Sequence, residues 1–145
     1  GIRAASIVLT VQLEVAQRAA AKPPDMSLLA VSIQYYGTSE VLFRIPPGQF
    51  YPSPAVDSAV LRILPHAQPR YEDAAWFFKW VKAGFSQPRK QLRNTLASSA
   101  GIGKETADAL LHTAGIEPTR RAETLAIDEW IALAIAARAM PQIDH

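Results

Sequence analysis

The sequence contains no cysteine, which excludes a disulfide scaffold and any zinc or iron–sulfur site with thiolate ligands. The same absence is compatible with a reducing compartment, and we expect a cytoplasmic protein. No apolar run reaches the roughly 18 to 20 residues that a membrane-spanning helix needs. What is present is a 145-residue chain, long enough for one globular domain or for a small domain with part of another.

Motifs of a self-contained catalytic site are also missing. The three histidines, His66, His112 and His145, lie far apart and belong to no HExxH motif, so we interpret them as surface or packing residues. No serine lies in a G-x-S-x-G turn. The segment from Gly101 to Lys104 lacks both the preceding strand and the spacing of a phosphate-binding loop.

Charge is unevenly distributed, although the net charge is only +2. The stretch between Asp73 and Glu105 has no acidic residue and six basic ones. Such a local excess of positive charge favours an anionic partner. The six residues are Lys79, Lys82, Arg89, Lys90, Arg93 and Lys104.

The first part of the chain alternates strands and helices. Residues 7–11 (IVLTV) form a continuous apolar, β-branched run, which predicts a strand buried on both faces within a parallel sheet. Because so few residues precede this strand, we expect the chain to be a fragment without its N-terminal half. Asp25 is the expected N-cap of a second helix that ends at Gly37. The further predicted elements are helices over 13–21 and 25–36 and strands over 40–45 and 56–64.

The second part is predicted to be helical throughout. A change of composition at residues 65–70 marks the expected boundary between a domain at 1–66 and a domain at 67–145. Asp128 is the expected cap of the last helix, with Glu129 in its first turn. The predicted helices cover residues 73–85, 88–97, 104–114 and 128–140.

Two segments have features of nucleic-acid binding. Phe50 lies in a proline-rich loop over residues 46–55, where its ring either stacks on a nucleobase or folds back into the core. In the helix expected from Pro88, Arg89 and Arg93 would share a face four residues apart. Cations there oppose the helix dipole, so free N–H groups with these side chains suggest a phosphate site; a solvated basic face is the alternative.

Five blocks of the sequence closely resemble the ribosomal RNA adenine N6-dimethyltransferases, in particular the small-subunit type whose loss gives kasugamycin resistance. Together they span nearly the whole chain. The F-x-P-x-P-x-V-D-S pattern from Phe50 to Ser58, followed by a basic segment, is the most specific part. The blocks are residues 11–18 (VQLEVAQR), 33–36 (IQYY), 41–60 (VLFRIPPGQFYPSPAVDSAV), 85–96 (FSQPRKQLRNTL) and 115–125 (GIEPTRRAETL).

The resemblance implies an α/β fragment: the last strands and helices of a Rossmann-like methyltransferase sheet, followed by a small all-helical domain that binds ribosomal RNA. Residues 7–11 would be the fifth strand, and the hairpin would supply the last two, one of them antiparallel. The glycine-rich loop and acidic residue that hold S-adenosylmethionine, and the Asn-Leu/Pro-Pro-Tyr motif that accepts the adenine amine, would precede Gly1. Transfer would proceed by direct displacement without a metal.

Site residues follow from the same resemblance. Phe50 matches the aromatic residue thought to stack on the target adenine once it leaves its helix. The residues implied to bind RNA are Gln87, Arg89, Lys90 and Arg93, with Lys79 and Lys82 as further cations. Two departures remove a cation each: Pro88 stands where arginine is usual, and Ala55 where lysine often precedes Val56-Asp57-Ser58.

Two further pairs keep alternative interpretations. Arg120 and Arg121 match a family turn, but Arg121 and Glu123 could equally form a structural ion pair. Gln12 and Glu14 follow the first strand, where open sheets place ligands, or they cap the next helix.

The sequence therefore predicts part of an S-adenosylmethionine-dependent enzyme that dimethylates two adjacent adenosines of small-subunit ribosomal RNA. By itself the chain is expected to be inactive. The alternatives are a non-catalytic RNA-binding or ribosome-assembly module and a methylase of large-subunit ribosomal RNA. Small-subunit RNA or its precursor particle is the expected partner, and self-association is one way to cover the edge of the first strand.

Overall fold

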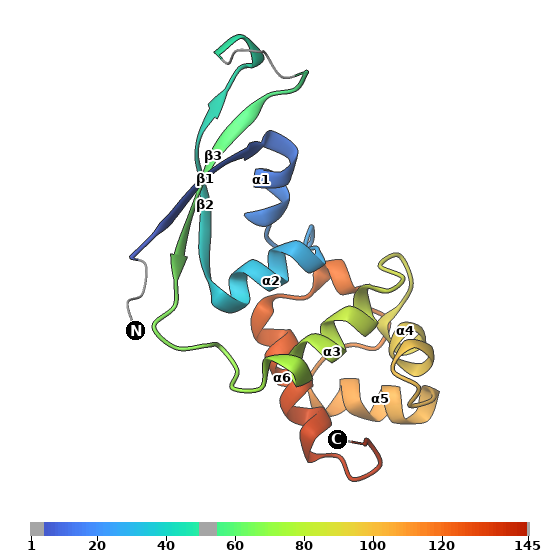
Figure 1. The fold of residues 1–145 in the computed structure, drawn as a ribbon. Coiled ribbons are helices and arrows are strands. Elements are labelled where there is room, and N and C mark those ends of the chain that lie inside the picture. The colour runs from blue at the N-terminus through green and yellow to red at the C-terminus, as the bar shows by residue number, and fades with distance from the viewer. Residues whose placement is uncertain (1–4, 50–54, 145) are drawn as a thin grey trace.

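The computed structural model describes residues 5–49 and 55–144. A three-stranded sheet carrying two helices is followed by a group of helices alone, so the α/β fold class expected from the sequence is confirmed (Figure 1). The first part contains β1 (Ile7–Gln12), α1 (Leu13–Ala19), α2 (Leu28–Tyr36), β2 (Gly37–Ile45), the 3₁₀ turn η1 (Pro47–Gln49) and β3 (Ser58–Pro65). The second contains α3 (Ala74–Phe85), α4 (Leu92–Ser99), α5 (Lys104–Thr113), the 3₁₀ turn η2 (Ala122–Thr124) and α6 (Ile127–Ala139).

The sheet has the order β1-β3-β2, and β3 runs antiparallel to both neighbours. This confirms the predicted hairpin and its antiparallel strand. Leu61 of β3 pairs with Leu9 on one side and Val41 on the other, and a bulge between Val41 and Phe43 shifts the register of β2. The hairpin extends well beyond α1, away from the helical part (Figure 1).

The prediction that the first strand is buried on both faces is wrong for this chain. Ile7, Val8 and Leu9 expose 40%, 57% and 43% of their surfaces. The reason is topological: β1 pairs only with β3 among the described residues, and that pairing is antiparallel. Burial of an apolar run depends on neighbours that its own composition does not specify.

Two apolar clusters form the core, and α2 lies between them. Ala16 and Ala19 of α1 pack with Ala59 and Leu61 of β3, and Leu29 and Ile33 of α2 pack against this cluster. The opposite side of α2 belongs to the larger, helical cluster, through Ala30, Val31 and Tyr35. A division at residues 66 and 67 stays a prediction, because α2 contributes to both clusters.

Local sequence explains several helix ends. Asp73 accepts the backbone N–H of Trp76 at 3.0 Å and so caps α3. Gly115 adopts a φ of +76° after α5, as expected for a glycine that ends a helix. Two predicted caps are wrong: Ser27, not Asp25, caps α2, and Asp128 is the second residue of α6 rather than its cap.

The helical core is built around large buried side chains. Trp76 and Trp80 lie one turn apart on α3 with ring centroids 5.5 Å apart, and Phe85 lies 5.5 Å from Trp130 of α6. The fully buried members that bring α3, α4, α5 and α6 together are Phe77, Trp80, Leu92, Leu96, Leu110, Leu111, Trp130 and Leu133.

Candidate nucleic-acid interface

The basic segment after α3 is a turn, not the start of a helix. α4 begins at Leu92, so the predicted helix over 88–97 is wrong at its N-terminal end. Gln91 is extended and forms an antiparallel bridge with Arg121. Because Gln91 is paired in this extended conformation, the helix cannot begin before it. Arg89 and Lys90 therefore lie in the turn before α4, and Arg89 and Arg93 do not share a helical face.

The expected free N–H groups at the start of α4 are occupied. The N–H of Leu92 donates to the carbonyl of Arg120 at 2.8 Å, and that of Arg93 donates to the carbonyl of Pro118 at 3.2 Å. The next two N–H groups donate to the carbonyl of Gln91. An anion at this place therefore has to be bound by side chains, and a phosphate site made from the backbone of α4 is ruled out.

The cations of this region differ in their partners. Arg93 donates to Asp108 Oδ2 at 2.8 Å, so its charge is already paired. Arg89 and Lys90 are exposed and form no ion pair with any of the described residues. Their charges are available to an outside anion.

Two lysines of α3 complete the predicted set. The ammonium of Lys79 lies 5.1 Å and 5.3 Å from the ring centroids of Trp76 and Trp80, a cation–π arrangement. Lys82 is exposed in the last turn of α3, where a cation interacts favourably with the helix dipole. Gln87 is exposed in the turn that follows.

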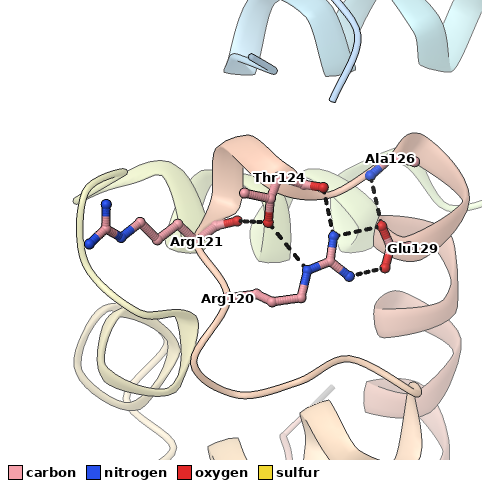
Figure 2. Close-up of polar contacts among 5 residues, drawn as sticks. All are labelled: Arg120, Arg121, Thr124, Ala126 and Glu129. Atoms are coloured by element: carbon pink, nitrogen blue, oxygen red, sulfur yellow. Dashed lines mark hydrogen bonds and ion pairs between the residues drawn. The ribbon is translucent and has the colours of Figure 1, made fainter. Parts of the chain in front are cut away.

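Arg120 and Arg121 point in opposite directions (Figure 2). The ion pair in this turn joins Arg120 to Glu129, and no pair between Arg121 and Glu123 occurs in the described part of the chain. Arg121 is exposed, and its bridge with Gln91 places its backbone beside the residue that follows Lys90. Sequence reasoning could not find this neighbour, because about 30 residues separate the two positions and only the tertiary bridge joins them.

A cleft of about 330 Å³ lies between the two parts of the molecule. Arg18 of α1 and Ser27 of the α1–α2 connection lie on one side, and Phe85 and Pro88 of the basic turn lie on the other, with Glu123 also in its lining. Arg18 is exposed and adds a cation from the sheet side that the sequence argument did not select. Its position in α1 gives no hint of this, because the cleft exists only in the folded chain.

A second hollow, of about 340 Å³, lies at the end of β1. Gln12, Glu14 and Gln17 line it together with Val56 and Asp57. Gln12 immediately precedes α1 but makes no side-chain capping bond, so the structure favours a lining position over the capping alternative for this residue. Phe50, the predicted base-stacking residue, lies outside the described residues.

Comparison with known proteins decides the family. The family model described as ribosomal RNA adenine dimethylase matches residues 2–138. The chain belongs to the ribosomal RNA adenine dimethylase family. Among curated members, it is 45% identical over 126 residues to ribosomal RNA small subunit methyltransferase A of Dehalococcoides mccartyi, covering 86% of this chain and 43% of that protein. The protein of the same name from Desulfitobacterium hafniense is 44% identical over 132 residues, covering 89% and 48%.

Solved structures support the fold of this dimethylase-family chain. A dimethyladenosine transferase from Plasmodium falciparum aligns with a TM-score of 0.78 at 18% identity, covering 88% of this chain and 55% of that one. The 23S ribosomal RNA methyltransferase ErmE aligns with a TM-score of 0.67 at 22% identity, covering 90% and 54%. The chain thus spans about half the length of the proteins it matches. None of its described helices is long and apolar enough to cross a membrane.

The resemblance found in the sequence implies S-adenosylmethionine as the methyl donor, and the described residues do not fit that cofactor. A Rossmann-like site needs a glycine-rich turn directly after a strand. The glycines with positive φ in the described part, Gly101, Gly103 and Gly115, all flank α4 or α5 in the helical part instead. We therefore assign no cofactor contact to these residues.

Proposed function

We propose that this chain is part of an S-adenosylmethionine-dependent enzyme that converts two adjacent adenosines of small-subunit ribosomal RNA to N6,N6-dimethyladenosine during ribosome biogenesis in the cytoplasm. One observation carries the proposal: 45% identity over 126 residues to a protein named ribosomal RNA small subunit methyltransferase A. Exposed cations of the helical part that have no ion-pair partner among the described residues agree with an RNA partner.

In this proposal the helical part, residues 67–145, binds RNA through phosphate contacts. Arg89 and Lys90 provide the main charges, and Arg121 joins them through the bridge at Gln91. The supporting residues predicted from the sequence are Gln87, Lys79 and Lys82. Arg93 takes a smaller share, because Asp108 already holds its guanidinium. Phosphate contacts position the protein on RNA without reading its sequence.

Phe50 is proposed to stack on the target adenine, which has to leave its helix before its amine can react. Its replacement by alanine should reduce methyl transfer in the intact enzyme far more than RNA affinity. The groups that accept the hydrogens of the amine are not in this chain: its only asparagine, Asn94, is followed by Thr95 rather than by Pro-Pro-Tyr or Leu-Pro-Tyr. The chain alone is therefore proposed to bind RNA without methylating it.

The test is RNA binding over a range of salt concentrations. Replacing Arg89, Lys90 and Arg121 together by alanine should flatten the log–log dependence of affinity on salt by about two to three units. Lys104→Ala is the matched control, since it removes an exposed cation at the start of α5 and leaves the basic turn intact. An unchanged slope in the triple variant would mean that these residues do not contact RNA phosphates and belong to an ordinary solvated surface.

A methyl-transfer assay with small-subunit particles tests the second half of the proposal. No transfer above background is expected from the 145-residue chain, and robust turnover would contradict it. The non-catalytic RNA-binding alternative predicts a different result only for the intact protein. Tight RNA binding by the intact protein without methyl transfer would favour that alternative.

The exposed edge of β1 supports self-association as a further part of the proposal. Val8 exposes 57% of its surface on a strand with one unpaired edge among the described residues. Such edges invite pairing with another strand, and a charged side chain opposes it. Sedimentation of the chain should reveal a dimer that Val8→Lys dissociates.

A further inference from the structure

Arg120 joins two parts of the helical unit through opposite ends of the same residue. Its backbone carbonyl accepts the N–H of Leu92 at 2.8 Å, at the start of α4. Its guanidinium faces the other way, toward α6 (Figure 2). The segment around Arg120 therefore links α6 to the basic turn, residues 86–91, which ends where α4 begins.

The guanidinium of Arg120 is held by a dense set of acceptors. It bonds both carboxylate oxygens of Glu129, one of them at 3.1 Å, and the carbonyl of Thr124 at 2.6 Å. Its Nε donates to the Thr124 hydroxyl at 3.3 Å, and that hydroxyl donates to the carbonyl of Arg121 at 2.7 Å. A planar guanidinium held in this way fixes direction as well as distance.

Glu129 is fixed in its turn. Its Oε1 accepts the N–H of Ala126 at 3.0 Å, at the N-terminal end of α6. The hydrogen bonds from Arg120 lower the pKa of this carboxyl, so it is charged at neutral pH. Arg120 thus contacts an anchored partner, and its side-chain bonds tie residues 118–121 both to η2, through Thr124, and to α6, through Glu129.

The segment tied down in this way supports the end of the basic turn and the start of α4. The carbonyls of Pro118 and Arg120 accept the N–H groups of Arg93 and Leu92, and Arg121 forms the bridge with Gln91. Lys90 is the residue next to that bridge, so the 118–121 segment supports the backbone at the end of the turn that carries Lys90. A side chain that orders this segment also orders the cations of the turn.

We propose that Arg120 and Glu129 are a positioning pair for RNA binding, which acts through residues 118–121 on the turn that carries Arg89 and Lys90. The inference rests on the proposed function, since it assumes that those cations bind RNA. Loosening the pair changes none of the side chains that are proposed to contact RNA. It lets the turn move more in the free protein, so that RNA binding has to remove more conformational freedom.

A comparison of two adjacent substitutions tests the inference, because both raise the net charge by one. Glu129→Gln removes the partner of Arg120, whereas Asp128→Asn removes the partner of Arg70, which lies outside the 118–121 segment. Electrostatics alone makes both variants bind a small-subunit ribosomal RNA transcript as tightly as the parent chain or more tightly. Positioning predicts that Glu129→Gln weakens binding about 3- to 10-fold while Asp128→Asn does not.

Amide hydrogen exchange separates positioning from a general loss of structure. The N–H groups of Leu92 and Arg93 should exchange faster in Glu129→Gln than in Asp128→Asn, while those in the middle of α3 stay protected. If Glu129→Gln does not fold, Arg120→Lys replaces it, since lysine keeps the charge but cannot span both carboxylate oxygens and Thr124. The same loss of affinity is expected from that variant.

The outcomes are separable from those of the proposed function. If the Arg89, Lys90 and Arg121 triple variant leaves the salt dependence unchanged, the RNA-binding proposal fails. If the triple variant flattens it while Glu129→Gln binds RNA like Asp128→Asn, the RNA surface stands and the positioning pair is refuted.

Discussion

Gly84 of α3 lies directly against the indole ring of Trp130 of α6. A Cβ atom at Gly84 would stand only 2.5 Å from Cη2 of Trp130, and Trp130 is fully buried. Leu92 of α4 is 3.2 Å from the same point. Three helices therefore meet at a position where the smallest residue sets how closely they pack.

Replacement of Gly84 by alanine should destabilise the protein. Alanine favours a helix over glycine by about 1 kcal/mol, but overpacking a core costs about 1–3 kcal/mol. Because the facing ring is rigid and enclosed, we expect the steric cost to dominate and the free energy of unfolding to fall by about 1–2 kcal/mol. Urea unfolding measures this. Gly48→Ala is the control: a Cβ there has no atom within 4 Å, so a change within about 0.5 kcal/mol is expected.

Arg93 and Lys90 should separate stability from RNA binding, although both are cations of one short segment. Arg93→Ala leaves Asp108 without its partner, and the free energy of unfolding should fall by up to about 1 kcal/mol. Lys90→Ala removes an exposed side chain, so stability should stay nearly constant while the salt dependence of RNA affinity flattens by about 0.7–0.9 units. Urea unfolding and filter binding measure the two effects. The reverse ranking would show that the pairing of Arg93 with Asp108 does not persist in solution.

Asp73 combines two roles that substitutions can divide. Its Oδ1 caps α3 by accepting the N–H of Trp76, and its Oδ2 accepts from Arg138 at 2.5 Å. Both interactions favour the charged form and lower the pKa of this carboxyl, the backbone bond contributing most. Asparagine retains a good cap but loses the charge, whereas alanine loses both. Melting temperatures should therefore fall in the order parent, Asp73→Asn, Asp73→Ala; equal values for the two variants would mean that the cap contributes nothing.

The parts of the fold that sequence could predict are those with local causes. The hairpin of β2 and β3, the helix that starts after Asp73 and the helix that ends before Gly115 follow from apolar patterns and caps within a few residues. The exposure of β1 was not predictable in the same way, because it depends on which strands lie beside it. A strand with the composition of a buried strand is exposed when few strands or helices lie beside it.

The candidate site divides along the same line. The basic residues from Lys79 to Arg93 could be selected from the sequence, because a run of cations without an acid stands out in any context, whereas Arg18 and Arg121 could not. Their partners could not. The pairing of Arg93 with Asp108, the bridge from Gln91 to Arg121 and the cleft that Arg18 and Pro88 both line all involve distant segments. As a result, the positive charge that is available to a partner lies on a turn and not on the helix face that the sequence had predicted.

Glu129 should make stability depend on pH in a defined direction. Its pKa is lowered in the folded protein, mainly by the hydrogen bonds from Arg120, so folding favours the charged carboxylate. This contribution is complete above the ordinary glutamate value of about 4.3 and disappears as the pH falls through the lowered folded value. Glu129→Gln should lower the free energy of unfolding by about 1–2 kcal/mol at pH 7, and its difference from the parent should shrink below about pH 4.

Chemical unfolding of both proteins between about pH 7 and pH 3 measures that difference. Asp128→Asn, with the same change of charge one residue earlier, controls for the general effect of removing an acid from the first turn of α6. The other titrating carboxyls are common to the parent and the Glu129 variant, so they cancel in the comparison. A difference that stays constant down to pH 3 would show that the bonded carboxylate does not stabilise the fold through its charge, and it would remove the anchor on which Arg120 depends.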